Sequence, residues 1–230
     1  MIRMYTLNYD RLFKNILEKE GMEIFEGFDL ENLYAEGVNK CPLNIKRIIM
    51  DTKSDCYYNL HGCANWHIDE TNENQLPGYQ YWMTGAPNLR NSSAYIEIEK
   101  GRKLLLTNII TGYQKVQRTA LSPFRQMFSA FDRDCTLADE IFVVGYSYAD
   151  EHINDIIRNA RRYNPQVKIT LINPSFEDEQ FMFKFLLNWG KVKDFIYQNQ
   201  GDDVVSEQYN ILPIRSTFYE FLKATNLTTA

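Results

Sequence analysis

The sequence has few of the residues that mark fibrous, low-complexity or membrane-spanning proteins. Its 230 residues include 11 glycines and 7 prolines, and its longest apolar stretches, such as Ile141–Gly145 and Leu104–Leu106, are short. These low contents exclude a collagen-like chain, and a hydrophobic content of 44% argues against disorder. Because a membrane helix needs about 20 apolar residues, we expect no membrane association.

The sequence also has no excess of positive charge. Its 25 basic and 30 acidic residues give a net charge of −5, so general binding to nucleic acid is not expected. The first residues lack the apolar segment of a secretion signal. No two of the four cysteines form a Cys-x-x-Cys pair, so the sequence predicts no structural zinc; they are Cys41, Cys56, Cys63 and Cys135. We therefore expect a cytoplasmic protein with reduced, buried thiols.

The order of the predicted elements indicates the fold class. Strand-like runs alternate with helical patterns, which is typical of βαβ units. The sequence predicts an α/β protein with a Rossmann-like open parallel sheet and helices on both faces. We expect one domain, residues 1–230, with a loop, hairpin or small subdomain inserted at about 65–107. Ligands of such sheets bind at the carboxyl ends of the strands.

Periodicity and turn residues predict the individual elements. Residues 65–93 are expected to be irregular, residues 140–144 to be a buried strand, and Leu12, Ile16 and Leu17 to form the apolar face of the first helix. The expected strands are 2–7, 45–50, 57–60, 140–144 and 167–172, with a hairpin of 95–99 and 102–106. The expected helices are 11–20, 116–132 with a break near Pro123, 150–162, 176–187 and 216–224.

Polar residues follow the first two of the parallel strands that we expect. Asn8 and Asp10 come after strand 2–7, and His61-Gly62 comes after strand 57–60. An imidazole at this edge can act as a base on a substrate. Each residue also has a structural interpretation, in which Asp10 caps the next helix, Asn8 holds the turn and His61 is a structural histidine. Of the other histidines, His67 lies in the long loop and His152 in a first helical turn, where a solvated role is expected.

Two further strands also end in polar turns. Gly145 and Ser147 follow strand 140–144 and supply backbone amides and a hydroxyl, which suit a phosphate or ribose. The alternative is a tight turn with Asp150 as the cap of the next helix. Asn173-Pro174 follows strand 167–172 and on its own indicates a turn.

Taken in order, these segments resemble the sirtuin superfamily, and most closely its bacterial branch of sirtuin-like NAD⁺ hydrolases of antiphage defence systems. The likeness covers most of the chain. It runs through Thr-x-Asn-Tyr-Asp at 6–10, Leu-His-Gly-Cys-Ala-Asn-Trp at 60–66, Ala-Asp-Glu-Ile-Phe-Val-Val-Gly-Tyr-Ser at 138–147 and Leu-Ile-Asn-Pro at 171–174. The resemblance implies NAD⁺ as the substrate, cleaved without a metal to nicotinamide and ADP-ribose. The lack of a four-cysteine module and the tyrosine of Asn-Tyr-Asp favour hydrolysis over deacetylation.

The same resemblance implies roles for individual residues. Asn8 would orient the nicotinamide ribose or the attacking water, and His61 would be the catalytic base. Asp10 would contact the nicotinamide end, the loop with Gly145 and Ser147 the phosphates and adenosine side, and Asn173 the adenosine ribose. The full set expected to bind the dinucleotide is Thr6, Asp10, Gly145, Ser147 and Asn173.

One part of the family pattern is not expected in this sequence. Family members carry a Gly-Ala-Gly phosphate loop upstream of the Thr-x-Asn motif, and neither 36–39 nor 82–87 has the context to replace it. Three interpretations remain. The protein is an NAD⁺ hydrolase completed by a partner chain, a homo-oligomer or a further N-terminal portion; it is a degenerate sirtuin-like nucleotide-binding or assembly subunit without turnover; or it is a Rossmann-like protein that binds another nucleotide.

Overall fold

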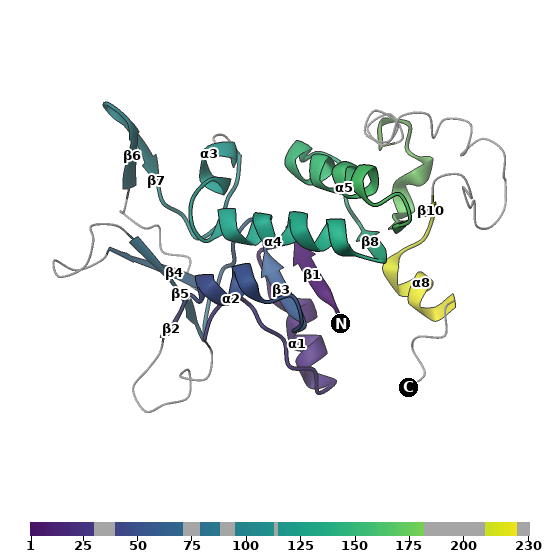
Figure 1. The fold of residues 1–230 in the computed structure, drawn as a ribbon, viewed down its shortest axis with the longest axis horizontal. Coiled ribbons are helices and arrows are strands. Elements are labelled where there is room, and N and C mark those ends of the chain that lie inside the picture. Colours follow the sequence, from purple (N-terminus) through teal and green to yellow (C-terminus); the bar gives the residue numbers. More distant parts are fainter. Residues whose placement is uncertain (30–39, 71–78, 88–94, 113–114, 182–209, 225–230) are drawn as a thin grey trace. The chain divides into compact units, whose positions relative to one another are not determined.

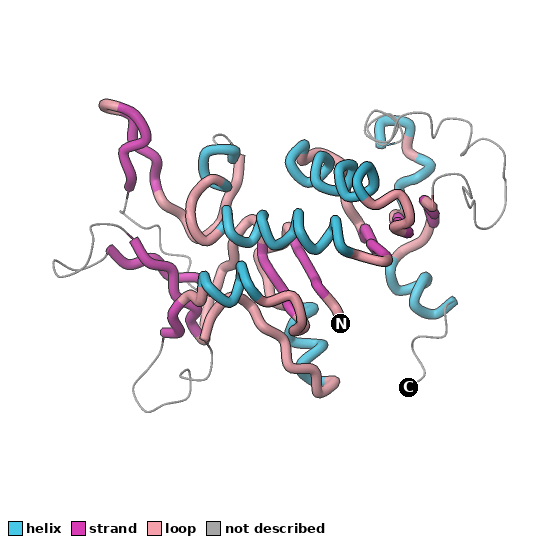
Figure 2. The backbone as a smooth tube through the Cα atoms, in the orientation of Figure 1, coloured by secondary structure: helices cyan, strands magenta, loops and turns pink. Residues whose placement is uncertain are grey.

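The computed structural model describes residues 1–29, 40–70, 79–87, 95–112, 115–181 and 210–224. The chain divides into two compact units, Met1–Phe131 and Asp132–Ala230. Each unit contains parallel strands and helices, as Figures 1 and 2 show. This mixed α/β architecture confirms the predicted Rossmann-like fold class. The assignment of residues 1–230 to one domain with an insertion at 65–107 stays a prediction.

A pair of parallel strands lies at the centre of the first unit. Strand β1 (Arg3–Thr6) pairs with β3 (Cys56–Asn59), and Thr6 is the register partner of Asn59. Figure 1 shows the two arrows side by side and pointing the same way. All four residues of β3 are buried. The expected strands 2–7 and 57–60 are thus confirmed, and their carboxyl ends lie at the same edge of the sheet.

The first helix forms where it was predicted, but with a different buried face. Helix α1 spans Leu12–Lys19, and Lys14 is its buried residue, with 3% exposure. Leu12 is 58% exposed and Ile16 is also exposed, so the apolar face expected for this helix is wrong. The physical reason is the buried carboxylate of Glu26, which pairs with the ammonium group of Lys14. The charged side chain therefore faces the interior.

Residues 45–50 form a helix, so the strand predicted there is wrong. Helix α2 spans Ile45–Met50. Asn44 caps its start, since the Asn44 side chain accepts a hydrogen bond from Arg47 N at 2.9 Å. This cap fixes the first turn. Ile48 is buried and Ile49 is exposed. The β-branched residues that favoured a strand are compatible with a short helix once the cap and the buried isoleucine hold it.

The region expected to be irregular contains part of a second sheet. Its three antiparallel strands run in the order β2-β5-β4. The strands are β2 (Lys40–Pro42), β4 (Trp66–Glu70) and β5 (Tyr79–Thr84). Trp66 packs against Tyr81 of this sheet and against Phe124. Strands β4 and β5 pair with each other, and β5 also pairs with the distant β2. The expectation of a loop is therefore wrong for 66–70 and 79–84; residues 71–78 and 88–93 lie outside the described residues.

The remaining elements of the first unit follow the prediction. Strands β6 (Tyr95–Glu99) and β7 (Arg102–Leu105) form the expected hairpin, with Gly101 at a φ of 78°. Figure 2 shows this hairpin extending away from β1 and β3. The helix expected at 116–132 is split by Pro123 into α3 (Lys115–Thr119) and α4 (Phe124–Leu137), the latter crossing into the second unit.

The second unit is built on a parallel sheet of order β10-β9-β8. Strands β8 (Glu140–Val144) and β9 (Lys168–Ile172) match the expected ones, whereas β10 (Ile211–Ile214) was not predicted from its short apolar run. Four residues of β9 are buried. In β8 only Val143 is buried, so the expectation of a fully buried strand at 140–144 is wrong.

The described residues of the second unit also contain helical elements. Helix α5 (Glu151–Tyr163) confirms the helix expected at 150–162, and it buries Ile153, Ile157 and Ala160. The first residues of the helix expected at 176–187 belong to a 3₁₀ turn, η2 (Pro174–Glu177). Residues 182–187 lie outside the described residues. Helix α8 (Phe218–Ala224) confirms the closing helix. Within the described part of the chain, every helix is too short or too polar to cross a membrane.

Candidate functional site

The first predicted motif forms a tight loop at the end of β1. The Thr6 hydroxyl oxygen accepts a hydrogen bond from Asn8 N at 3.1 Å, and the Thr6 carbonyl accepts one from Leu60 N at 2.9 Å. The side chains of Asn8 and Asp10 are exposed. Asp10 Oδ1 accepts a hydrogen bond from Leu12 N at 2.9 Å, so its carboxylate also stabilises the start of α1.

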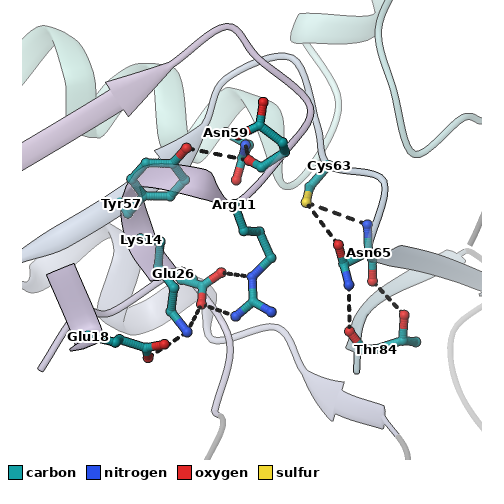
Figure 3. Close-up of polar contacts among 10 residues, drawn as sticks. Arg11, Lys14, Glu18, Glu26, Tyr57, Asn59, Cys63, Asn65 and Thr84 are labelled. Carbon is teal, nitrogen blue, oxygen red and sulfur yellow. Dashed lines mark hydrogen bonds and ion pairs between the residues drawn. The ribbon is translucent and has the colours of Figure 1, made fainter. Parts of the chain in front are cut away.

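A buried amide lies under this loop. The Asn59 side-chain nitrogen donates to the carbonyl oxygens of Asn8 at 2.9 Å and of Asp10 at 3.0 Å. The Tyr57 hydroxyl approaches the same Asp10 carbonyl at 3.4 Å. Figure 3 shows Tyr57 and Asn59 next to each other at this position. The backbone of the Asn8–Asp10 loop is therefore held from below by β3.

The second predicted motif follows β3 directly. The His61 side chain is 4% exposed, and its ring centroid lies 6.5 Å from that of Phe128. The His61 carbonyl accepts a hydrogen bond from Ile110 N at 2.8 Å. Gly62 has a φ of 87°, and a Cβ atom there would overlap the carbonyl oxygen of Asn108. This close approach explains why glycine follows the histidine.

Residues 108–110 connect the two motifs. Asn108 O accepts a hydrogen bond from Cys63 N at 3.0 Å, and Ile110 O accepts one from the Tyr9 hydroxyl at 3.2 Å. Ala64 N in turn donates to Tyr9 O at 2.9 Å. The Asn-Tyr-Asp loop, the His-Gly turn and the segment after the hairpin thus form one hydrogen-bonded group.

An ion-pair cluster is buried beside this group. Glu26 is 2% exposed, and its carboxylate makes a two-point contact with the Arg11 guanidinium and a 2.7 Å ion pair with Lys14 Nζ. Lys14 also pairs with Glu18 at 2.5 Å, as Figure 3 shows. Burial alone would lower the pKa of Arg11, but the hydrogen bond and charge of Glu26 raise it, so the guanidinium stays charged. Arg11 immediately follows Asp10, so this cluster fixes the chain where the loop ends.

The cysteines provide no reactive or metal-binding centre in the described residues. All four are free and buried, as expected. Burial raises the pKa of Cys63 to about 11, although the Asn65 amide that contacts its sulfur opposes the shift. Cys63 is therefore a neutral thiol at physiological pH. Among the described residues no group of three or more histidines, cysteines or carboxylates could hold a metal ion.

The second unit brings its three predicted site residues to one edge of its sheet. Gly145 follows β8 with a φ of 62°, and its amide donates to Ile172 O at 2.9 Å. Asn173 follows β9, is buried, and donates from its side chain to Tyr146 O at 3.0 Å. Its Oδ1 accepts from Ser175 N at 2.9 Å. The side chain of Ser147 is exposed on the same turn.

The start of α5 is already capped by a carboxylate. Asp150 Oδ1 accepts a hydrogen bond from His152 N at 3.2 Å, and Glu151 lies in the first turn. The capping role predicted for Asp150 is confirmed. The Tyr146 hydroxyl lies 2.8 Å from Asn154 Oδ1, which ties the turn to α5. Because two acidic residues occupy this helix end, the N-terminus of α5 is itself a poor site for an anion.

A family model described as a SIR2-like domain matches residues 3–185 of the 230-residue chain. The chain belongs to the SIR2-like domain family. SIR2-like domains bind NAD⁺, so the membership indicates an NAD-related function. The comparison with curated proteins finds no match to this chain.

In this SIR2-like domain, the candidate residues fall into two groups, and two contributors, Asn59 and Glu26, were missed. Thr6, Asn8, Asp10 and His61 lie together in the first unit, and the other three lie in the second. Asn59 was not singled out, although a polar residue at the end of an apolar strand, two positions before His61, was a usable signal. The charge of Glu26, set within the apolar run 24–28, was a similar signal for the ion-pair cluster.

Proposed function

We propose that this SIR2-like domain hydrolyses NAD⁺ at the nicotinamide–ribose bond, as part of an antiphage defence system. One observation carries the proposal. Thr6 and Asn59 are register partners in parallel strands, and Asn8 and His61 each lie two residues beyond them. The expected water-orienting amide and the expected base therefore follow neighbouring strands at one sheet edge, where ligands of α/β proteins bind.

The reaction needs a positioned base and a positioned water. The bond between ribose C1′ and the nicotinamide nitrogen breaks, and its electron pair neutralises the cationic ring. The Asn8 side chain orients water toward C1′ as the oxocarbenium-like state develops. His61 takes the proton of that water as the new C–O bond forms, which yields ADP-ribose and releases the proton to solvent.

The other residues bind the dinucleotide in this proposal. Asp10 contacts the nicotinamide end at the loop that begins with Thr6. The turn with Gly145 and Ser147 contacts the adenosine side and phosphates, where the exposed Ser147 supplies a hydroxyl. Asn173 holds the adenosine ribose while its amide also supports the Tyr146 carbonyl.

Histidine variants test the proposal. His61→Ala removes the base, so we expect nicotinamide release to fall by about 10²–10⁴-fold. His67→Ala is the matched control, because His67 lies in β4 and pairs with Asp69 at 2.6 Å. We expect this control to release nicotinamide at the parent rate, as followed by chromatography. Equal rates for the parent and His61→Ala would exclude His61 as the base.

A second candidate function is a nucleotide-binding or assembly subunit without turnover. It is favoured by the low exposure of His61 and by the hydrogen bond from Leu12 N to Asp10, since both give these residues a structural purpose. In this case NAD⁺ does not shift the melting temperature, and no nicotinamide appears at high protein concentration. The same two measurements therefore separate the candidates.

A further inference from the structure

We infer that Asn59 is a positioning residue that fixes the Asn8–Asp10 loop for the reaction with NAD⁺. This inference rests on the proposed function. The Asn59 amide donates to two carbonyl oxygens of that loop, at 2.9 Å and 3.0 Å. One rigid strand residue thereby sets the backbone on both sides of Tyr9.

Because Asn59 is buried, the loss of these two hydrogen bonds would be costly. Asn59 is 2% exposed, and it lies at the end of a strand whose four residues are all buried. Water has little access to replace the lost donors in a variant, and a buried carbonyl without a donor is costly. The loop would then lose two of its hydrogen bonds to β3. It would retain the longer contact of the Tyr57 hydroxyl, the hydrogen bonds of Tyr9 and the Thr6 and Leu12 contacts at its ends.

The position of Asn59 links it to both proposed catalytic groups. It is the register partner of Thr6, which precedes Asn8 by two residues, and it precedes His61 by two residues. Its side chain sets the Asn8 backbone, and its own backbone carries the chain into the His-Gly turn, where Gly62 N donates to Asn59 O at 3.0 Å. Asn59 touches neither substrate nor reacting atoms in this account, and it acts through Asn8.

The test compares Asn59→Leu with Asn164→Leu. The Asn164 side chain also donates to two backbone carbonyls two residues apart, Thr136 at 3.3 Å and Ala138 at 2.9 Å, in the second unit. The control therefore removes the same kind of bridge at a place outside the proposed site. Asn59→Ser, which keeps one short donor, is measured in parallel as a milder variant in case Asn59→Leu does not fold.

Amide hydrogen exchange of residues 8–12 gives a readout that does not depend on activity. We expect Asn59→Leu, and Asn59→Ser to a smaller extent, to exchange about tenfold faster there than the parent, because two hydrogen bonds are lost. Asn164→Leu should match the parent in this segment. Equal exchange at residues 8–12 in the Asn59 and Asn164 variants would overturn the inference.

The kinetic parameters for NAD⁺ provide the second readout. We expect kcat of the Asn59 variants to fall by about tenfold or more, with KM changed by less than about threefold, since misplaced catalytic groups slow the chemical step. A raised KM with an unchanged kcat would contradict the positioning role. Absence of turnover by the parent would contradict the proposed function alone, because hydrogen exchange decides the role of Asn59 separately.

Discussion

At the scale of single residues, Gly62 has a backbone conformation that excludes other amino acids. Its φ is 87°, and an added Cβ would overlap the Asn108 carbonyl oxygen and lie 2.9 Å from the carbonyl carbon. We expect Gly62→Ala to lower the free energy of unfolding by about 3 kcal/mol or more, because strain and a backbone clash combine. Urea denaturation measures this change.

The control for this prediction is Gly101→Ala. Gly101 has a similar φ of 78°, but no atom lies within 4 Å of its added Cβ. Only the left-handed backbone is then strained, at a cost of about 1–2 kcal/mol. If both variants lost the same stability, the close contact between the His-Gly turn and residue 108 would be contradicted.

The buried carboxylate of Glu26 leads to a second residue-scale prediction. Glu26→Gln leaves Arg11 and Lys14 without their shared anion, so we expect unfolding free energy to fall by about 3–5 kcal/mol. Glu18→Gln is the matched control, since Glu18 pairs with the same Lys14 but is 42% exposed, and should cost at most about 1 kcal/mol. Chemical denaturation of both variants at neutral pH makes the comparison, and equal losses would refute the importance of the buried cluster.

At the scale of elements, the Asp51 carboxylate stabilises the turn between α2 and β3 by accepting hydrogen bonds. Burial would raise the pKa of its carboxyl group, but hydrogen bonds from Lys53, Ser54 and Arg47 outweigh burial and lower it well below the usual range. A lowered folded-state pKa gives stability that is complete above the ordinary value of about 3.9 and is lost as the pH falls below it.

We therefore expect Asp51→Asn to be less stable than the parent at pH 7, and the difference to shrink as the pH is lowered below about 4. Urea denaturation at a series of pH values measures this dependence. Asp55→Asn is the control, because Asp55 is a second carboxylate near the same turn. Its Oδ1 accepts a hydrogen bond from Ile2 N. A stability difference for Asp51→Asn that stays constant between pH 7 and pH 3 would contradict the role of the ionised carboxylate.

Local patterns predicted the elements that depend on local interactions. The hairpin around Gly101, the helix capped by Asp150 and the strands at 57–60 and 140–144 all form where turn residues and apolar runs placed them. The failures have two causes. Residues 45–50 follow the Asn44 cap instead of β propensity, and β2 and β10 depend on pairing with residues distant in sequence.

The candidate site could be predicted only in part, because contacts between residues distant in sequence support it. Sequence order placed Asn8 and His61 after strands, and the parallel register of β1 and β3 brings both strand ends to one edge. The support beneath them comes from Asn59, Glu26 and residues 108–110, which contact the motifs across long sequence separations. No local pattern specifies which buried polar group meets which loop.

At the scale of the whole molecule, membership of the SIR2-like domain family indicates an NAD-related function. We expect NAD⁺ at about 100 times its Kd to stabilise the protein by about 2.7 kcal/mol, seen as a higher melting temperature. ATP at the same concentration is the control and should have a smaller effect. Equal shifts with NAD⁺ and unrelated nucleotides would favour a Rossmann-like protein that binds another nucleotide.

The measurement that tests the account most directly is the time course of NAD⁺ consumption by the purified full chain. Nicotinamide and ADP-ribose are quantified together, and His61→Ala is run beside the parent. The account predicts that the parent forms both products in equal amounts and that the variant forms them at least about 100-fold more slowly. Nicotinamide release that is the same in both proteins would contradict it.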